Sequence, residues 1–196
     1  DLFLTHFHPD HVAGLPGYLM SMWLLKRTKP LHIYGLTGVL ENAIAMLDLY
    51  EWREWPGFFK VEFHSIPENE HYLALECEEF RIITSPVRHM IPNIGFRIEF
   101  SEHARVMAYS GDTSPCDEVV RLAAGADLLI HEATGAEYGH SSAAQAGTIA
   151  RQAEVGKLAL IHYSTRVERG NHLVEQARAT FGGTVILAKD FMEFEF

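Results

Sequence analysis

The sequence predicts an α/β protein in which two sheets pack face to face with helices outside them. Two observations lead to this prediction. The first half of the chain is rich in consecutive strands, whereas helices and strands alternate after Gly111. The chain of 196 residues also shows no internal repeat, low-complexity tract or linker. We therefore expect one domain over residues 1–196.

The individual elements follow from hydrophobic periodicity and from the positions of glycine and proline. Strands are expected over residues 1–5, 31–34, 60–65, 72–76, 79–85, 94–100, 105–109, 127–131, 157–161, 184–188 and 191–196. Helices are expected over residues 12–26, 37–49, 115–124, 141–153 and 172–181. Residues 6–11 are expected to form a loop, because Pro9 cannot pair regularly in a strand.

Composition limits the partners and the compartment. A formal net charge of −10 disfavours broad attraction to DNA or to an anionic membrane. No apolar run approaches the length of a membrane span. Cys77 and Cys116 make no disulfide framework and lack a zinc-binding spacing, so we expect reduced thiols. These features predict a cytoplasmic protein that binds neither DNA nor membranes.

The segment after the first predicted strand concentrates metal-binding side chains. His6, His8, Asp10 and His11 lie within six residues. In an extended segment, residues two apart point the same way, so His6, His8 and Asp10 are expected to converge. Imidazole and carboxylate together suit zinc, with manganese or iron as substitutes. The segment therefore predicts half of a two-metal hydrolase site.

Further ligands must come from elsewhere, because one loop cannot complete two metal coordination spheres. Three candidates follow later predicted strands, namely His89, Asp112 and His162. The ends of strands are where the ligand sites of α/β folds collect. We therefore expect these three side chains to supply the other half of the site.

In this order, these motifs resemble the metallo-β-lactamase superfamily, which implies an αββα sandwich. Two further segments resemble its tRNA 3′-end endonuclease branch, tRNase Z (ribonuclease Z). They are His131-Glu132-Ala133-Thr134 and Gly139-His140-Ser141-Ser142-Ala143. The same branch is indicated by Gly14-Leu15-Pro16-Gly17, Ile33-Tyr34-Gly35 and the run from His162 to Arg166. The resemblance covers essentially the whole chain.

The resemblance implies two zinc ions per chain. Their ligands would be His6, His8 and His89 for one ion, Asp10, His11 and His162 for the other, and Asp112 as the bridge. Metal coordination would lower the pKa of a water molecule and make it a nucleophile. The two cations also carry more positive charge than the two carboxylates cancel, which favours an anionic phosphodiester substrate.

Three residues receive catalytic roles from the same resemblance. Asp10 would orient the attacking water or receive its proton. Glu132 would hold His140 in the correct tautomer, and His140 would protonate the leaving oxygen. We expect His131 to support the site rather than act in it.

The chain departs from the family in two respects. The N-terminal strands that precede the metal motif in the family are absent, so we expect a truncated N-terminus. His89 and Asp112 are only 23 positions apart, and two strands fill this interval as a hairpin, which leaves no room for the arm that grips tRNA in many tRNase Z proteins. The other candidates for RNA contact are Arg88, Arg97 and Arg166.

The chemistry is therefore better defined than the substrate, which is either RNA or a small phosphodiester. The alternatives are hydrolysis of another ester (an aryl sulfate, a lactone or a thioester) and an inactive binding homologue. The resemblance also raises the possibility of a homodimer through the apolar stretch from Leu15 to Leu25, although core packing explains that stretch equally well.

Overall fold

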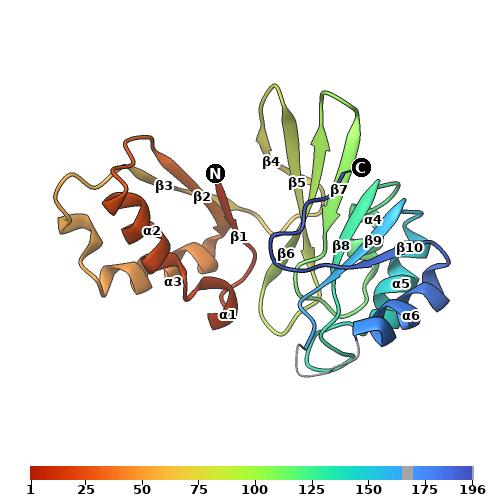
Figure 1. Cartoon of the computed structure of the whole chain (residues 1–196). Coiled ribbons are helices and arrows are strands. Elements are labelled where there is room, and N and C mark those ends of the chain that lie inside the picture. The colour runs from red at the N-terminus through yellow and green to blue at the C-terminus, as the bar shows by residue number, and fades with distance from the viewer. Residues whose placement is uncertain (165–169, 196) are drawn as a thin grey trace. The chain divides into compact units, whose positions relative to one another are not determined.

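The structure is a computed structural model that describes residues 1–164 and 170–195. The chain divides into two compact units, Asp1–Glu68 and Asn69–Phe196 (Figure 1). Each unit contains one sheet with helices packed against it. The alternation of helices and strands predicted from the sequence is thus present, and the single-domain boundary stays a prediction.

The first unit is built on a parallel sheet with the strand order β1-β2-β3. These strands are Leu2–Leu4, Leu31–Leu36 and Val61–Ile66. The helices are α1 (Pro9–Val12), α2 (Leu15–Leu24) and α3 (Thr37–Asp48), and a 3₁₀ turn, η1, covers Trp52–Glu54. Helix α3 contacts β2 and β3, and Leu19, Ile33 and Leu47 are fully buried.

The apolar stretch in α2 is only partly explained by this core. Leu15 and Leu19 are buried, whereas four large apolar side chains are exposed, namely Tyr18, Met20, Leu24 and Leu25. Core packing therefore accounts for one side of the stretch, and the homodimer stays a prediction.

Two sequence predictions are corrected in this unit. The predicted helix over 12–26 is interrupted at Ala13 and Gly14, and α1 already begins at Pro9. Proline is favoured in the first turn of a helix because its fixed φ fits and its missing N–H has no partner there. Asp10 therefore lies on a helical turn rather than in an extended segment, so the argument that placed it beside His6 by alternation is wrong.

The second unit is built on a seven-stranded sheet with the order β10-β9-β8-β7-β6-β5-β4. Its strands are β4 (Tyr72–Glu76), β5 (Phe80–Val87), β6 (Asn93–Phe100), β7 (Arg105–Tyr109), β8 (Leu128–Glu132), β9 (Lys157–Ile161) and β10 (Thr184–Leu187). Strands β4 to β7 pair antiparallel, and β7 to β10 pair parallel. In the sequence, consecutive strands give way to alternating helices and strands at Gly111. In the structure, the sheet changes there from antiparallel to parallel pairing.

Three helices accompany this sheet: α4 (Asp117–Leu122), α5 (Ala143–Gln152) and α6 (Gly170–Phe181). Helices α5 and α6 lie side by side (Figure 1), and α5 also contacts β8 and β9. A capping box starts α5, in which Ser142 and Gln145 each bond the other's backbone N–H. This cap fixes the point where the segment holding His140 turns into the helix.

The predicted last strand over 191–196 is wrong for residues 191–195, none of which lies in a strand. The sequence alternates polar and apolar residues there, but Phe191 has a φ of 63°, which breaks an extended run. Alternation by itself cannot make a strand without a neighbour that satisfies its backbone groups.

Replacing Gly147 with alanine tests the packing of α5 on α6. A Cβ at this position would overlap the carbonyl oxygen of Ala177 and Oγ1 of Thr180. We expect Gly147→Ala to lower the free energy of unfolding by about 1–3 kcal/mol, measured by urea denaturation. The matched control is Gly17→Ala in α2, where a Cβ meets nothing within 4 Å, so that a stabilisation of up to about 1 kcal/mol is expected. Equal stability of the two variants would contradict the close approach.

Candidate metal centre

Strand direction determines which loops meet in the second unit. Strands β7, β8 and β9 are parallel, and β5 runs the same way as β7 because both are antiparallel to β6. The carboxyl ends of all four strands therefore lie at one edge of the sheet. The residues at or just after these ends include His89, Asp112, Glu132 and His162.

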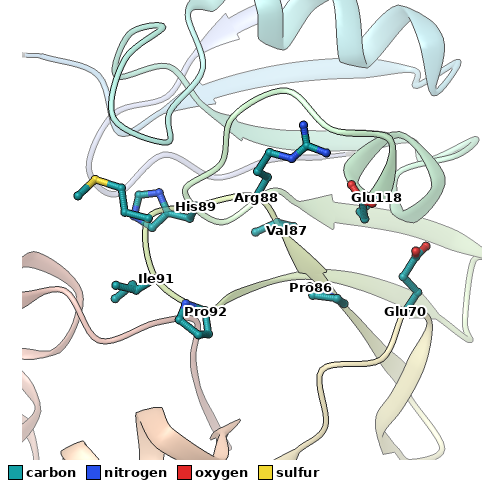
Figure 2. A pocket seen from close by; sticks show the side chains of 9 residues that line it. Glu70, Pro86, Val87, Arg88, His89, Ile91, Pro92 and Glu118 are labelled. Atoms are coloured by element: carbon teal, nitrogen blue, oxygen red, sulfur yellow. The ribbon is translucent and has the colours of Figure 1, made fainter.

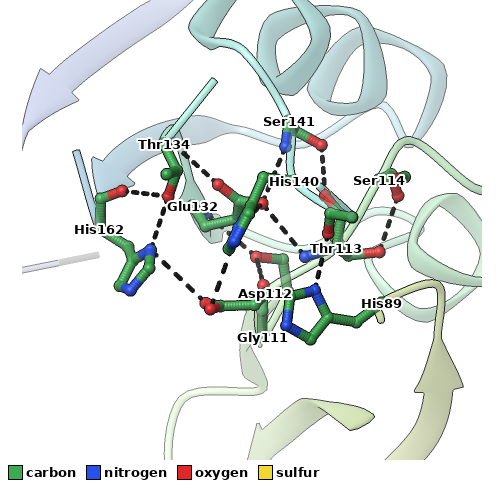
Figure 3. A network of polar contacts seen from close by, with 12 residues as sticks. His89, Gly111, Asp112, Thr113, Ser114, Glu132, Thr134, His140, Ser141 and His162 are labelled. Carbon is green, nitrogen blue, oxygen red and sulfur yellow. Dashed lines mark hydrogen bonds and ion pairs between the residues drawn. The ribbon is translucent and has the colours of Figure 1, made fainter. Parts of the chain in front are cut away.

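Asp112 lies at the centre of this group and is only 2% exposed. Its backbone carbonyl accepts a hydrogen bond of 2.7 Å from Nδ2 of Asn93. Its carboxylate oxygens lie 3.9 Å from Nδ1 of His140 and 3.7 Å from Nδ1 of His162 (Figure 3). The preceding turn requires glycine, because Gly111 has a φ of 61° and a Cβ there would lie 2.8 Å from the carbonyl oxygen of Ile94.

His89 is oriented by one backbone hydrogen bond. Its Nδ1–H donates to the carbonyl oxygen of Gly139 over 2.8 Å, which leaves Nε2 as the unprotonated nitrogen of a neutral ring. Gly139 has a φ of 81°, and a Cβ there would lie 2.9 Å from Nδ1 of His89. Glycine at position 139 is thus needed for the ring to be held in this way.

The contacts of Thr134 set the tautomer of His162 (Figure 3). The Thr134 hydroxyl donates its one proton to the carbonyl oxygen of His162 over 2.7 Å. Nδ1 of His162 lies 2.6 Å from the same hydroxyl oxygen, so Nδ1 must be the donor. The Nε2 lone pair is then the one that can bind a cation.

Glu132 is fully buried and joins several segments. Its Oε1 accepts from the backbone N–H of Thr113 at 3.1 Å, the backbone N–H of Ser141 at 2.8 Å and Nδ1–H of His140 at 3.1 Å. Its Oε2 accepts from the backbone N–H of Thr134 at 2.8 Å. The pairing of Glu132 with His140 that the resemblance implies is therefore present.

The first unit places its four candidate residues together at the end of β1. His6 is fully buried, its Nδ1 lies 3.0 Å from the Thr5 hydroxyl, and its Nε2 lies 3.1 Å from Nδ1 of His8. The ring centroids of His6 and His11 are 4.2 Å apart, and Nε2 of His11 lies 3.5 Å from the Asp10 carboxylate. Three imidazoles and a carboxylate thus lie within one short segment.

The donor set of the second unit suits a divalent cation. His89, Asp112 and His140 each offer a ligand atom within 4.8 Å of the other two, although Nδ1–H of His140 is already bonded to Glu132. Ligand atoms about 2.0–2.2 Å from one zinc ion lie roughly 3–4 Å from each other. Burial first, and then the negative charges of Asp112 and Glu132, raise the pKa of Tyr109 to about 12, so its hydroxyl stays neutral beside these carboxylates. Buried carboxylates in proteins are paired or bind metals.

His131 lies next to Glu132 in β8, and its supporting role stays a prediction. It is fully buried, and its Nδ1–H donates to the carbonyl oxygen of Glu132 over 2.7 Å. Burial lowers the pKa of its imidazole, so the neutral ring is the stable form. Sequence reasoning gave no individual role to Asn93, Thr113, Thr134 or Ser141, whose backbone and hydroxyl contacts have no signal in a single sequence.

The arginines proposed for RNA contact differ in whether their side chains already have partners within the protein. Arg97 is occupied: it donates to Glu99 and to the carbonyl oxygens of Leu122 and Ala124, so it clamps β6 to the end of α4. Nε and Nη1 of Arg97 are therefore engaged within the protein, and a contact of this residue with RNA stays a prediction. Arg166 lies outside the described residues.

Arg88 is exposed and stays a candidate. It lines a cavity of about 480 Å³ next to His89, together with Met90, Ile91 and the carboxylates of Glu70 and Glu118 (Figure 2). The side chain of Arg88 thus places a positive charge at the wall of this cavity, beside the proposed ligand His89.

Comparisons with known proteins identify the family of the chain. The family model described as the β-lactamase superfamily domain matches residues 2–163. The ribonuclease Z of Methanothermobacter thermautotrophicus is 31% identical over 99% of this chain and 78% of its own length. The ribonuclease Z of Bacillus licheniformis is 31% identical over 99% of this chain and 80% of its own length.

The chain is also similar in three dimensions to a solved structure. The human tRNase Z, short form, superimposes with a TM-score of 0.77 at 29% identity, covering 97% of this chain and 76% of that chain. The chain therefore belongs to the metallo-β-lactamase superfamily, in the branch of ribonuclease Z. The predicted fold class is confirmed, and with it a metal-dependent hydrolase. Among the described residues, no helix combines the length and apolar character needed to cross a membrane.

Replacing Glu132 with glutamine tests its buried hydrogen bonds. An amide has only one acceptor oxygen, so at least one buried donor would face the NH₂ group. We expect a loss of about 1–3 kcal/mol in the free energy of unfolding, measured by urea denaturation, together with reduced activity. The matched control is Glu102→Gln, whose side chain is 87% exposed and which should leave both quantities unchanged. An equal effect of the two substitutions would show that Glu132 does not organise these segments.

Proposed function

We propose that this protein is a dinuclear zinc phosphodiesterase of the ribonuclease Z type. The observation that supports the proposal most directly is the pair Glu132 and His140, with Nδ1 of His140 at 3.1 Å from the carboxylate and 3.9 Å from Asp112. A proton donor and a carboxylate ligand then share one small site.

In this proposal the metal ligands are those that the family resemblance implies. His6, His8 and His89 would hold one zinc ion, Asp10, His11 and His162 would hold the other, and Asp112 would be a ligand of both. Two zinc ions would stabilise negative charge on the substrate and lower the pKa of a water molecule. Manganese or iron would suit the same donors.

In this proposal, side chains of the protein donate the proton, orient the water and contact the substrate. Glu132 accepts Nδ1–H of His140 and so directs Nε2 of that ring away from the carboxylate. Nε2 of His140, when protonated, gives its proton to the leaving oxygen. Asp10 orients the attacking water or takes its proton. The exposed guanidinium of Arg88 is assigned to contact the anionic substrate.

The hairpin between His89 and Asp112 limits the proposed substrate. Strands β6 and β7 pair antiparallel and are joined by residues 101–104, so this interval holds no long arm. The alignment to the Methanothermobacter ribonuclease Z spans 249 residues, more than this whole chain, so that relative carries insertions. We therefore propose that the enzyme acts on RNA ends or small phosphodiesters without a separate grip on folded tRNA.

Two substitutions separate metal binding from proton transfer. Asp112→Ala should lose both activity and metal, because this carboxylate is proposed to bind both ions. His140→Ala should keep the metal and lose about 10²–10⁴-fold in kcat, because it removes a proton donor. Metal content is measured by elemental analysis, and activity with bis(p-nitrophenyl) phosphate.

The matched control is His103→Ala, whose side chain is 74% exposed and lies away from these segments in the chain. It should retain both metal and activity. Loss of zinc from His140→Ala would show that His140 is a metal ligand and would refute its assigned role.

A panel of esters tests the substrate class. We expect turnover of bis(p-nitrophenyl) phosphate and none of p-nitrophenyl sulfate, a lactone or a thioester, with Asp112→Ala as the blank for each. The reverse pattern would favour the alternative of a different ester hydrolase. Fewer than about one zinc ion per chain, not restored by added zinc, would favour an inactive binding homologue.

A further inference from the structure

A second group of metal-binding side chains lies in the first unit, on neighbouring strands of its sheet. His32 is on β2, and Glu62 and His64 are on β3. His32 pairs in register with Glu62, and Tyr34 pairs with His64. Residues paired in this way point to the same face, so all three side chains share one side of the sheet.

The ligand atoms of these side chains converge. Nδ1 of His32 lies 2.9 Å from Nε2 of His64 and 3.0 Å from Oε2 of Glu62. Oε2 of Glu62 lies 3.9 Å from Nε2 of His64. The three side chains are between 30% and 40% exposed, so an ion can reach them from solvent.

Neighbouring side chains hold two of the three groups in place. The ring of Tyr34 stacks on the ring of His64, with centroids 4.6 Å apart and planes 19° apart. Lys60 forms an ion pair with Oε1 of Glu62, which turns Oε2 toward the two imidazoles. This arrangement reduces the number of rotamers that must be lost when a ligand binds.

We propose that His32, Glu62 and His64 form a separate binding site for a divalent cation of the zinc, cobalt or nickel type. Two imidazoles and one carboxylate are a ligand set that such ions accept, with solvent completing the coordination. To surround one ion at about 2.0–2.2 Å, the two shorter distances would lengthen and the 3.9 Å distance would shorten, each by roughly half an ångström. The ion would join β2 to β3.

This site is distinct from the metal motif of the same unit. His6 follows the carboxyl end of β1, and Leu4 of that strand pairs with Gly35 of β2. His32 lies near the opposite end of β2. At about 3.3 Å per residue, the two groups are roughly 15 Å apart along the strands. The proposed site therefore does not depend on the proposed hydrolytic function.

Zinc titration of the full chain against a chromophoric chelator tests the proposal. Wild type should bind one zinc ion more than His64→Gln or His32→Gln, and Glu62→Gln should weaken this ion by at least about tenfold. Asp112→Ala, which should empty the proposed hydrolytic centre, should still bind the additional ion. His64→Gln should keep the activity of wild type toward bis(p-nitrophenyl) phosphate.

His103→Gln is the matched histidine control and should leave the zinc count unchanged. Circular dichroism of the zinc-free proteins checks that the variants fold as wild type does. The proposal is overturned if correctly folded His64→Gln binds as many zinc ions as wild type, or if His103→Gln loses the same ion.

Discussion

The buried carboxylate of Glu132 holds together the parts of the chain that form the candidate centre. It accepts the backbone N–H groups of Thr113, Thr134 and Ser141, which belong to the loops after β7 and β8 and to the start of α5. A fully buried carboxylate is tolerated only when its oxygens are satisfied, so these loops must stay where the donors reach it. The orientation of His140 and the position of the turn at Asp112 both follow from this constraint.

The same edge of the sheet supplies the other groups because of strand direction. Strands β5, β7, β8 and β9 run in the same direction, so the loops that follow them lie at the same edge of the sheet. Backbone carbonyls and a threonine hydroxyl then fix the tautomers of His89 and His162, which leaves Nε2 of both rings unprotonated. Such contacts turn histidines near a site into oriented ligands. The membership in the ribonuclease Z branch agrees with this arrangement.

Two features of the second unit bear on the proposed substrate. The Glu132–His140 contact and the candidate ligands are present, whereas a plain hairpin occupies the interval between His89 and Asp112. Arg97, a candidate for contacting RNA, instead ties β6 to the end of α4 through two carbonyl oxygens. These bonds engage Nε and Nη1 of Arg97 within the protein, whereas the side chain of Arg88 is exposed.

The sequence by itself determined the fold class, most strands and helices, and the candidate residues, because periodicity and motif spacing are local properties of the chain. Its errors were also local: the helical turn at Pro9 and the absence of a strand over 191–195 depend on caps and on strand partners. Only the tertiary structure decided which nitrogen of His89 and of His162 carries the proton and which segments Glu132 joins. It also brought His32 beside His64, since sheet register places residues 32 positions apart within 2.9 Å.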